Sequence, residues 1–202
     1  MSADPVFVTA AMGTADLLIA ELAAFGVADL REGHGGVNGS ATLAQAYRAC
    51  LWSRVGLRVL WRVAEFPVTN ANELYEGVRT VDWSEHLSIA DTLTVDFSGS
   101  VPGVVHTRFG AQRVKDAVVD QFRDQTGGRP SVDRLAPTLR INVHAGRATV
   151  TVAIDLSGDS LHRRGYRGAQ GAAPLKEHLA AAILLRSTWP AIAEAGGAFV
   201  DP

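Results

Sequence analysis

The stretch ADLREGHGGVNGSA, residues 28–41, decides how the first third of the chain folds. Its two halves have the length of short strands, and Gly33, Gly35 and Gly36 supply a tight turn between them. The glycines superficially suggest a dinucleotide-binding loop, but Asn38 stands where the third required glycine would be, and no helical pattern follows directly. We therefore predict a β-hairpin here.

Helical and extended patterns flank this hairpin on both sides. Residues 6–10 alternate as a strand, and residues 13–26 carry apolar residues at helical spacing. Residues 42–54 are again helical, with Thr42 as a candidate N-cap, and residues 57–68 are extended. The resulting β-α-β-β-α-β order is the split arrangement of a ferredoxin-like domain.

The remaining sequence also mixes helices with strands. Its longest helix ends at TGGRP, where two glycines form a C-cap and a proline cannot continue the helix. The fold class is therefore α+β. In chain order we expect a helix at 70–83, a strand at 91–100, the long helix at about 107–125, a hairpin of strands at 138–144 and 148–158, a helix at 174–189 with Pro174 in its first turn, and the start of a strand at 198–202.

Composition excludes several classes of protein. Cys50 is the only cysteine, which rules out an internal disulfide framework and a cysteine-based zinc cluster. The six histidines have no helical i, i+4 spacing, so we predict no metal site and expect surface or capping roles for all six. No run approaches the roughly 18 apolar residues of a membrane span, and the first residues lack a basic leader. We expect a cytoplasmic protein with no catalytic residue and no cofactor site of its own.

Charge is divided unevenly along the chain, although the net charge is only -2. Residues 1–106 contain 6 arginines against 12 acidic residues, a net of -6. Residues 107–168 contain 11 basic residues against 6 acidic ones, a net of +5, and residues 169–202 supply the remaining -1. A polyanion is therefore expected to bind the second half of the chain.

The segment LHRRGYR, residues 161–167, is the strongest local signal for RNA. Arg163, Arg164 and Arg167 present planar donors that suit phosphate oxygens, and Tyr166 offers a face for an unpaired base. The alternative is a turn at the glycine, with the tyrosine packed on the preceding strand and the arginines solvated. A short basic loop does not decide between these readings.

The long helix carries a second set of candidate cations. Arg108 and Lys115 have no acidic residue at i±3 or i±4, so they are freer to contact phosphate, and Arg108 lies near the positive helix N-terminus. The predicted apolar face is Ala111, Val114, Val118 and Phe122. The predicted i, i+3 pairs of a solvated helix are Arg113 with Asp116, and Asp120 with Arg123.

Several stretches together resemble one family. VKDAVVDQFR (114–123), RPSVDR (129–134) and DLSGDSLHRRGYR (155–167) are similar to the THUMP-containing bacterial 23S rRNA guanine-N2 methyltransferases. GTADLLIAEL (13–22) and the later GGVNG and ACLWSR resemble the ferredoxin-like domain that precedes THUMP in that family. The resemblance covers essentially the whole chain.

The resemblance implies three domains. It places a ferredoxin-like domain at 1–68, an α/β THUMP RNA-binding domain at 69–160, and a linker with the first helix of a truncated Rossmann-like methyltransferase domain at 161–202. Asp201 and Pro202 match the start of the strand that leads to a Cys-Gly-Ser-Gly-Thr loop for S-adenosylmethionine in the family. Neither that loop nor the family's Asn-Pro-Pro-Tyr motif occurs in the chain.

The resemblance therefore implies a role in RNA recognition. The parent enzyme would transfer a methyl group from S-adenosylmethionine to a guanine of 23S rRNA, and this segment would position the RNA. Arg129 and Arg134, in the shared RPSVDR stretch, join the residues expected to contact RNA. Four readings stay open beside it: the THUMP module of a tRNA-modifying enzyme, a non-enzymatic RNA-binding protein, a complete small enzyme, and a purely structural interaction domain.

Overall fold

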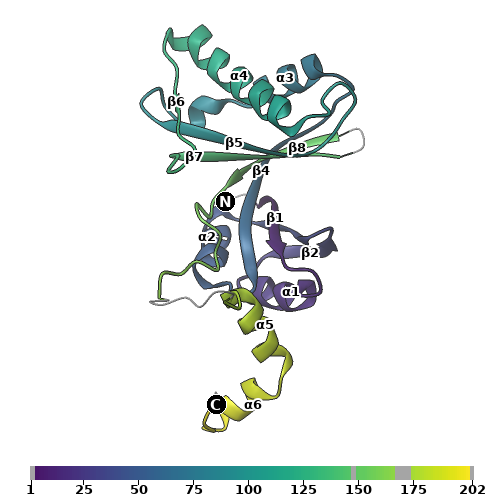
Figure 1. Ribbon diagram of the computed structural model, residues 1–202, viewed down its shortest axis with the longest axis vertical. Helices are drawn as coiled ribbons and strands as arrows, with labels where there is room; N and C mark the ends of the chain where they lie inside the picture. Colours follow the sequence, from purple (N-terminus) through teal and green to yellow (C-terminus); the bar gives the residue numbers. More distant parts are fainter. Residues whose placement is uncertain (1–2, 147–148, 167–173, 201–202) are drawn as a thin grey trace. The chain divides into compact units, whose positions relative to one another are not determined.

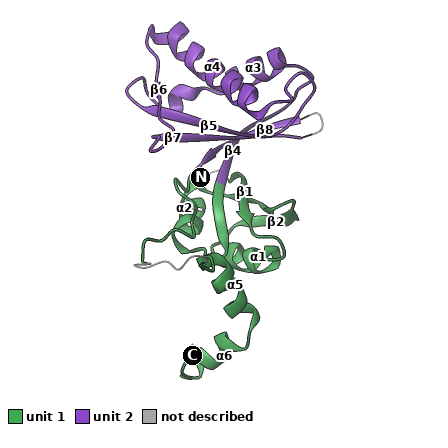
Figure 2. Ribbon diagram, in the orientation of Figure 1, with its two compact units in different colours: residues 1–59, 156–202 green, residues 60–155 purple. Residues whose placement is uncertain are grey.

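The chain divides into two compact units, which Figure 2 shows in green and purple. Unit 1 contains residues 1–59 and 156–202, and unit 2 contains residues 60–155. None of the helices in the described part of the chain is long and apolar enough to cross a membrane. The computed structural model describes residues 3–146, 149–166 and 174–200.

Unit 1 has the predicted β-α-β-β-α-β order (Figure 1). Its strands lie in the order β2-β3-β1-β4, with β1 and β2 both antiparallel to β3. Helix α1 packs on β2 and β3, and helix α2 packs on β3. The elements are β1 (Asp4–Ala10), α1 (Ala15–Ala24), β2 (Ala28–Gly33), β3 (Gly36–Ala41), α2 (Leu43–Trp52) and the first residues of β4 (Gly56–Pro67).

Local sequence explains two of the turns in unit 1. Thr42 caps α2 as predicted, because its hydroxyl accepts the Gln45 N–H while the Gln45 side chain accepts the Thr42 N–H at 2.7 Å. In the β2-β3 hairpin, Gly35 adopts a φ of 74°. A Cβ on Gly36 would lie 2.2 Å from the Val8 carbonyl oxygen, so only glycine fits there. The hairpin prediction is confirmed.

The core of unit 1 is built from the inward faces of its strands and helices. Leu18 and Leu22 of α1 are fully buried at i, i+4 spacing, as the helical pattern predicts. Burying one such side chain stabilises the fold by about 1.5–3 kcal/mol. Other buried members include Val6, Val8, Val37, Ala46, Ala49, Val55 and Val59.

The last part of unit 1 departs from the prediction. Helix α5 spans Glu177–Arg186 with Lys176 as its N-cap, so Pro174 precedes the helix and does not occupy its first turn. A short helix that the pattern did not predict, α6 (Trp189–Glu194), follows it. Residues 198–200 form no strand, in contrast to the expectation. Asp201 and Pro202 lie outside the described residues.

Unit 2 is a mixed sheet with two helices over one face (Figure 1). Its strand order is β4-β8-β7-β5-β6, in which β5 runs parallel to β7 and β6 while β8 is antiparallel to β4 and β7. The elements after β4 are α3 (Ala71–Arg79), the 3-10 helix η1 (Trp83–Glu85), β5 (Thr92–Gly99), α4 (Thr107–Thr126), β6 (Ser131–Val132), β7 (Leu139–Ala145) and β8 (Thr149–Asp155).

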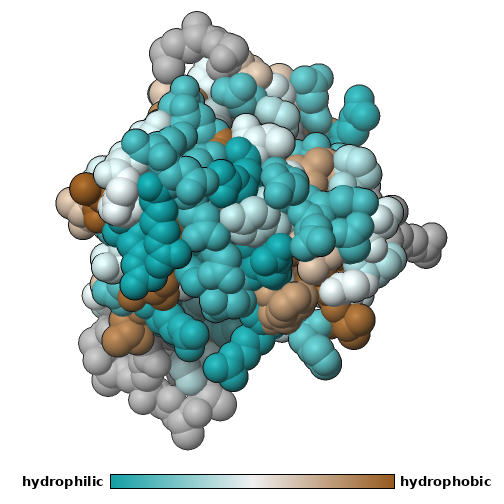
Figure 3. Space-filling view, turned by 90° about the horizontal axis from the view of Figure 1, so that it is seen from above, coloured by the Kyte–Doolittle hydropathy of each residue, from teal (hydrophilic) through white to brown (hydrophobic). Residues whose placement is uncertain are grey.

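Helix α4 packs on β5 and α3 through the predicted apolar face. Val114, Val118 and Phe122 are buried there, and Ala111 is half-buried. The helix ends where predicted, because Gly127 adopts the left-handed conformation that follows a helix C-terminus. Hydrophilic residues dominate the surface in Figure 3, which looks onto the α3 and α4 side of this unit.

Candidate RNA-binding surfaces

The N-terminal end of α4 presents Arg108 to solvent. Its side chain is exposed and makes no hydrogen bond or ion pair with any other described residue. His106, the N-cap residue, makes no side-chain hydrogen bond to the helix. The first amide groups of a helix carry partial positive charge, so this end combines a guanidinium with a favourable helix terminus for an anion. Phe109 beside it is also exposed.

Lys115, in the middle of α4, is less available than predicted. Its ammonium group pairs with the neighbouring carboxylate of Asp116, and only 22 % of its side chain is exposed. The same carboxylate accepts a hydrogen bond from Gln112 at 3.1 Å. The expectation that Lys115 lacks a partner is wrong, because the long lysine chain reaches a residue that helical i±3 and i±4 spacing does not consider.

The two arginines assigned to helix pairs behave differently from each other. Arg123 pairs with Asp120 at 3.0 Å, as predicted. Arg113 does not pair with Asp116. Instead its guanidinium lies 4.6 Å from the centroid of the Tyr75 ring, in a cation-π contact that joins α4 to α3. Both arginines therefore serve the structure of unit 2.

The loop after α4 exposes Arg129 and Arg134. Neither side chain has a hydrogen bond or ion pair within the described residues. The loop is ordered by Asp133, whose carboxylate accepts the N–H groups of Leu135 and Ala136 at 2.8 and 3.1 Å. These two hydrogen bonds lower the pKa of Asp133. Arg134 is thus exposed to solvent on a loop whose conformation is held by the Asp133 carboxylate.

Among the described residues of unit 2, the cations without a partner lie at two separate places. Helix α4 has 20 residues, so at 1.5 Å per residue it is about 30 Å long. Arg108 lies at its first turn, whereas Arg129 and Arg134 follow its last. An RNA that contacts both ends must therefore extend over the length of the helix.

Arg164 of the basic segment has a structural role. Its guanidinium donates to the carbonyl oxygens of Cys50, Leu51 and Ser53 at 2.9, 3.0 and 2.8 Å. These groups lie at the C-terminus of α2, where carbonyls lack helical partners and carry partial negative charge. Arg164 caps this helix through three of its five N–H donors. Because these bonds fix the guanidinium against the end of α2, we propose a structural role for it in place of the predicted phosphate contact.

The rest of the segment is accessible. Arg163 is exposed and its side chain has no partner within the described residues. Gly165 adopts a φ of 78°, which makes the turn, and Tyr166 is 72 % exposed. The alternative in which Tyr166 packs on the preceding strand is therefore wrong. Arg167 lies outside the described residues.

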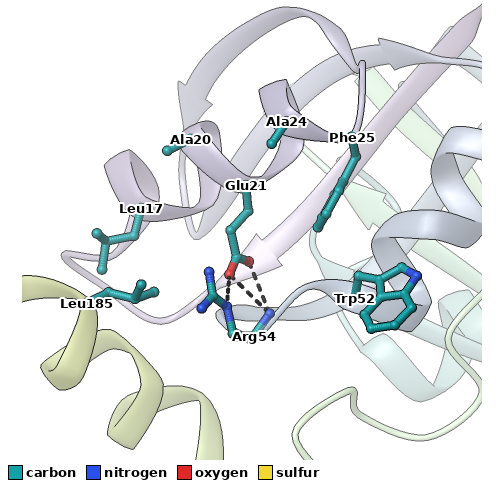
Figure 4. A pocket seen from close by; sticks show the side chains of 8 residues that line it. All are labelled: Leu17, Ala20, Glu21, Ala24, Phe25, Trp52, Arg54 and Leu185. Carbon is teal, nitrogen blue, oxygen red and sulfur yellow. Dashed lines mark hydrogen bonds and ion pairs between the residues drawn. The ribbon is translucent and has the colours of Figure 1, made fainter. Parts of the chain in front are cut away.

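Sequence reasoning missed a cluster at the end of α2. Glu21 of α1 is only 7 % exposed, and its carboxylate accepts from the Ser53 hydroxyl at 2.8 Å. It also accepts from the Arg54 backbone N–H and Nε, each at 3.0 Å (Figure 4). Trp52 is 69 % exposed beside it. The aromatic and basic residues of LWSR (51–54) were the sequence feature that could have indicated this cluster. Glu21, Trp52 and Arg54 line a cavity of about 590 Å³, together with Leu17, Ala20, Ala24, Phe25 and Leu185.

One histidine pair was also unexpected. His178 of α5 is 4 % exposed, and its ring centroid lies 5.3 Å from that of His162. Burial, and next the neighbouring His162, lower the pKa of His178. The expected surface role of the histidines is therefore wrong for His178. Within the described residues no group of three or more His, Cys, Asp or Glu could hold a metal ion.

Comparison with known proteins assigns both domains. The RlmL ferredoxin-like domain matches residues 5–60, and the THUMP domain matches residues 68–155. The chain thus contains an RlmL ferredoxin-like domain followed by a THUMP domain, and the predicted family resemblance and fold class are confirmed.

The curated relatives are ribosomal RNA methyltransferases. The chain is 52 % identical over 197 residues to the ribosomal RNA large subunit methyltransferase K/L of Pseudomonas fluorescens (strain Pf0-1), and 49 % identical over 197 residues to that of Pseudomonas aeruginosa. Each match covers 98 % of this chain but only 26 % and 27 % of the relative. The chain therefore spans about a quarter of the length of these relatives.

Solved structures share the fold. A predicted N6-adenine-specific DNA methylase from Listeria monocytogenes matches with a TM-score of 0.82 and 30 % identity, over 94 % of this chain and 50 % of that one. A putative methyltransferase, SMU.472, complexed with SAH, matches with a TM-score of 0.79 and 27 % identity, over 94 % and 50 % of the two chains. Both proteins are about twice as long as the matched segment.

Proposed function

We propose that this chain is the RNA-recognition portion of an S-adenosylmethionine-dependent 23S rRNA guanine-N2 methyltransferase that acts in the cytoplasm. The half-identical relatives named as ribosomal RNA methyltransferases support this assignment, as does the THUMP domain. The proposal keeps the division into domains at 1–68, 69–160 and 161–202. The observation that carries it is the set of exposed guanidinium groups on unit 2 that have no partner among the described residues: Arg108, Arg129 and Arg134.

The chemistry of the reaction explains why recognition is a separate task. The exocyclic amine of guanine is a poor nucleophile because its lone pair is delocalised into the ring. The base must therefore be held in a fixed geometry against the methyl donor, and correct placement supplies much of the rate. Contacts with phosphates fix register and orientation without reading sequence. The exposed arginines of this chain serve that positioning.

The methyl donor is not assigned to residues of this chain. The glycine-rich stretch at 33–39 forms the tight β2-β3 hairpin and does not lead into a helix N-terminus. The Cys-Gly-Ser-Gly-Thr and Asn-Pro-Pro-Tyr motifs are absent from the 202 residues. The contribution of these residues is to bind and orient RNA.

A salt series with a 23S rRNA fragment tests the proposal. We expect the affinity of the full chain to fall as salt rises, because phosphate contacts release counterions. Changing Arg108, Arg129 and Arg134 together to Ala should reduce the magnitude of the log-log salt slope by about 2, at roughly 0.7–0.9 for each lost contact. Arg123→Ala is the matched control, since its guanidinium is already paired with Asp120.

Three results would contradict the proposal. Binding that does not depend on salt would exclude phosphate recognition. An unchanged slope in the triple variant would place the contacts elsewhere. Tighter binding to tRNA than to the 23S fragment at the same salt concentration would favour the THUMP module of a tRNA-modifying enzyme.

A further inference from the structure

A second cavity in unit 1 adjoins the first and has a different lining. Its volume is about 540 Å³, within the range of small-molecule and cofactor sites. Trp52 and Arg54 line both cavities. The second cavity is an open cleft between the end of α2, the segment 161–166 and helix α5. Its other lining residues are Leu51, Ser53, Leu161, His162, Arg164, Tyr166, Glu177, Ala180, Ala181 and Leu184.

Two large aromatic side chains line this cavity and remain mostly exposed. Trp52 and Tyr166 are 69 % and 72 % exposed. Within the described residues, neither ring stacks on another aromatic ring or lies under a cation. Exposed aromatic rings of this size are typical of binding sites, because they gain contact area when a ligand covers them.

The fold holds the two rings in place although they are far apart in sequence. Arg164 binds the last carbonyl groups of α2, and Trp52 is the last residue of that helix. Tyr166 follows Arg164 by two residues. The arginine cap therefore fastens the segment that carries Tyr166 to the helix end that carries Trp52.

The cavity also has positive charge beside its aromatic walls. The Arg54 side chain is 63 % exposed, and within the described residues its guanidinium contacts only Glu21, through Nε at 3.0 Å. Arg163 is exposed next to the lining residues His162 and Arg164. Guanidinium groups suit phosphate oxygens, and they also stack on bases.

We infer that this cavity binds an unpaired nucleotide of the RNA, with the base against Trp52 and Tyr166 and the phosphate reached by Arg54 and Arg163. Aromatic platforms beside a cationic edge are how proteins hold single-stranded nucleic acid. The inference rests on the proposed function, and it adds a single-strand contact on unit 1 to the phosphate contacts of unit 2.

Anisotropy titrations of the full chain test the inference with two labelled probes, a short single-stranded RNA and the duplex of the same sequence. Trp52→Ala and Tyr166→Ala should each weaken single-strand binding roughly 5- to 140-fold, and duplex binding by less than about twofold. The salt slope should stay unchanged, because no phosphate contact is lost, whereas Arg163→Ala should reduce its magnitude by about 0.7. Trp52→Phe keeps an aromatic face and should recover most of the affinity.

Tyr47→Ala provides the matched control. Tyr47 is an exposed aromatic residue on α2 that does not line the cavity, so its loss should leave both affinities unchanged. Equal effects of Trp52→Ala and Tyr47→Ala would overturn the inference, as would unchanged single-strand binding in the Trp52 and Tyr166 variants. If the triple arginine variant of unit 2 then still lost affinity, the proposed function would stand without the cavity. A circular dichroism spectrum of each variant separates loss of contact from loss of fold.

Discussion

Replacing Arg164 should destabilise the protein, whereas replacing the adjacent Arg163 should not. Arg164 donates three hydrogen bonds, between 2.8 and 3.0 Å, to carbonyl oxygens at the end of α2. A hydrogen bond to a charged group contributes about 1.5–3 kcal/mol, and a cation at a helix C-terminus adds about 0.3–1 kcal/mol. Because water can replace part of these contacts at an exposed helix end, we expect Arg164→Ala to cost about 2 kcal/mol in total.

Urea and thermal unfolding of the full chain measure this effect. For a chain of this length a loss of about 2 kcal/mol lowers Tm by roughly 4–8 °C. Arg163→Ala should change the free energy of unfolding by less than about 0.5 kcal/mol, because its side chain has no partner within the described residues. Arg164→Lys should lie between the wild type and Arg164→Ala, since an ammonium group keeps the charge but lacks the planar fork.

The two substitutions should affect the salt dependence of RNA binding in the opposite order. Arg163→Ala should reduce the magnitude of the salt slope by about 0.7, and Arg164→Ala should leave the slope unchanged even where the affinity falls. Equal stability losses in the two alanine variants would refute the capping role. A reduced slope in Arg164→Ala would show that its guanidinium does reach phosphate.

Three further predictions concern packing and titration. Gly110→Ala should destabilise unit 2 by about 1–3 kcal/mol in urea unfolding, because its Cβ would lie 2.8 Å from the Phe97 ring; a variant as stable as wild type would show that the ring can move. Glu21→Ala should cost about 2–4 kcal/mol, since it leaves the buried Ser53 hydroxyl and nearby N–H groups without their acceptor; Glu21→Gln should recover part of this. Folding lowers the pKa of His178, so just below the ordinary histidine pKa of about 6.5 the unfolded chain binds more protons than the folded chain. The free energy of unfolding should therefore fall as the pH drops through that value, and His178→Gln should flatten this part of the pH profile.

The order of elements could be predicted because its causes are local. The glycines of the β2-β3 hairpin, the Thr42 cap and the apolar spacing of α4 act within a few residues of themselves. Strand β6 was missed because it has two residues and exists only through parallel pairing with β5, as in Thr92 with Ser131. A strand that depends on a distant partner leaves no periodic pattern of its own.

The candidate site was predicted less completely, for the same reason. Trp52 was not predicted as a site residue because it stands alone at the end of a helix. The other residues that line its cavity include segments more than a hundred residues further along the chain. Lys115 was expected to be free because only helical neighbours were considered, whereas Asp116 pairs with it. His178 was expected at the surface because the residues next to it in the sequence do not indicate that this position of α5 is buried.

The sequence by itself determined most of the succession of strands and helices and the concentration of positive charge after residue 106, because periodicity, turn chemistry and charge are properties of neighbouring residues. Only the tertiary structure decided which cations are available to RNA. Arg163 and Arg164 are adjacent and chemically identical, yet Arg164 alone caps α2. That difference arises because folding brings the unpaired carbonyls of a distant helix end within 3 Å of one guanidinium, and leaves the other in solvent.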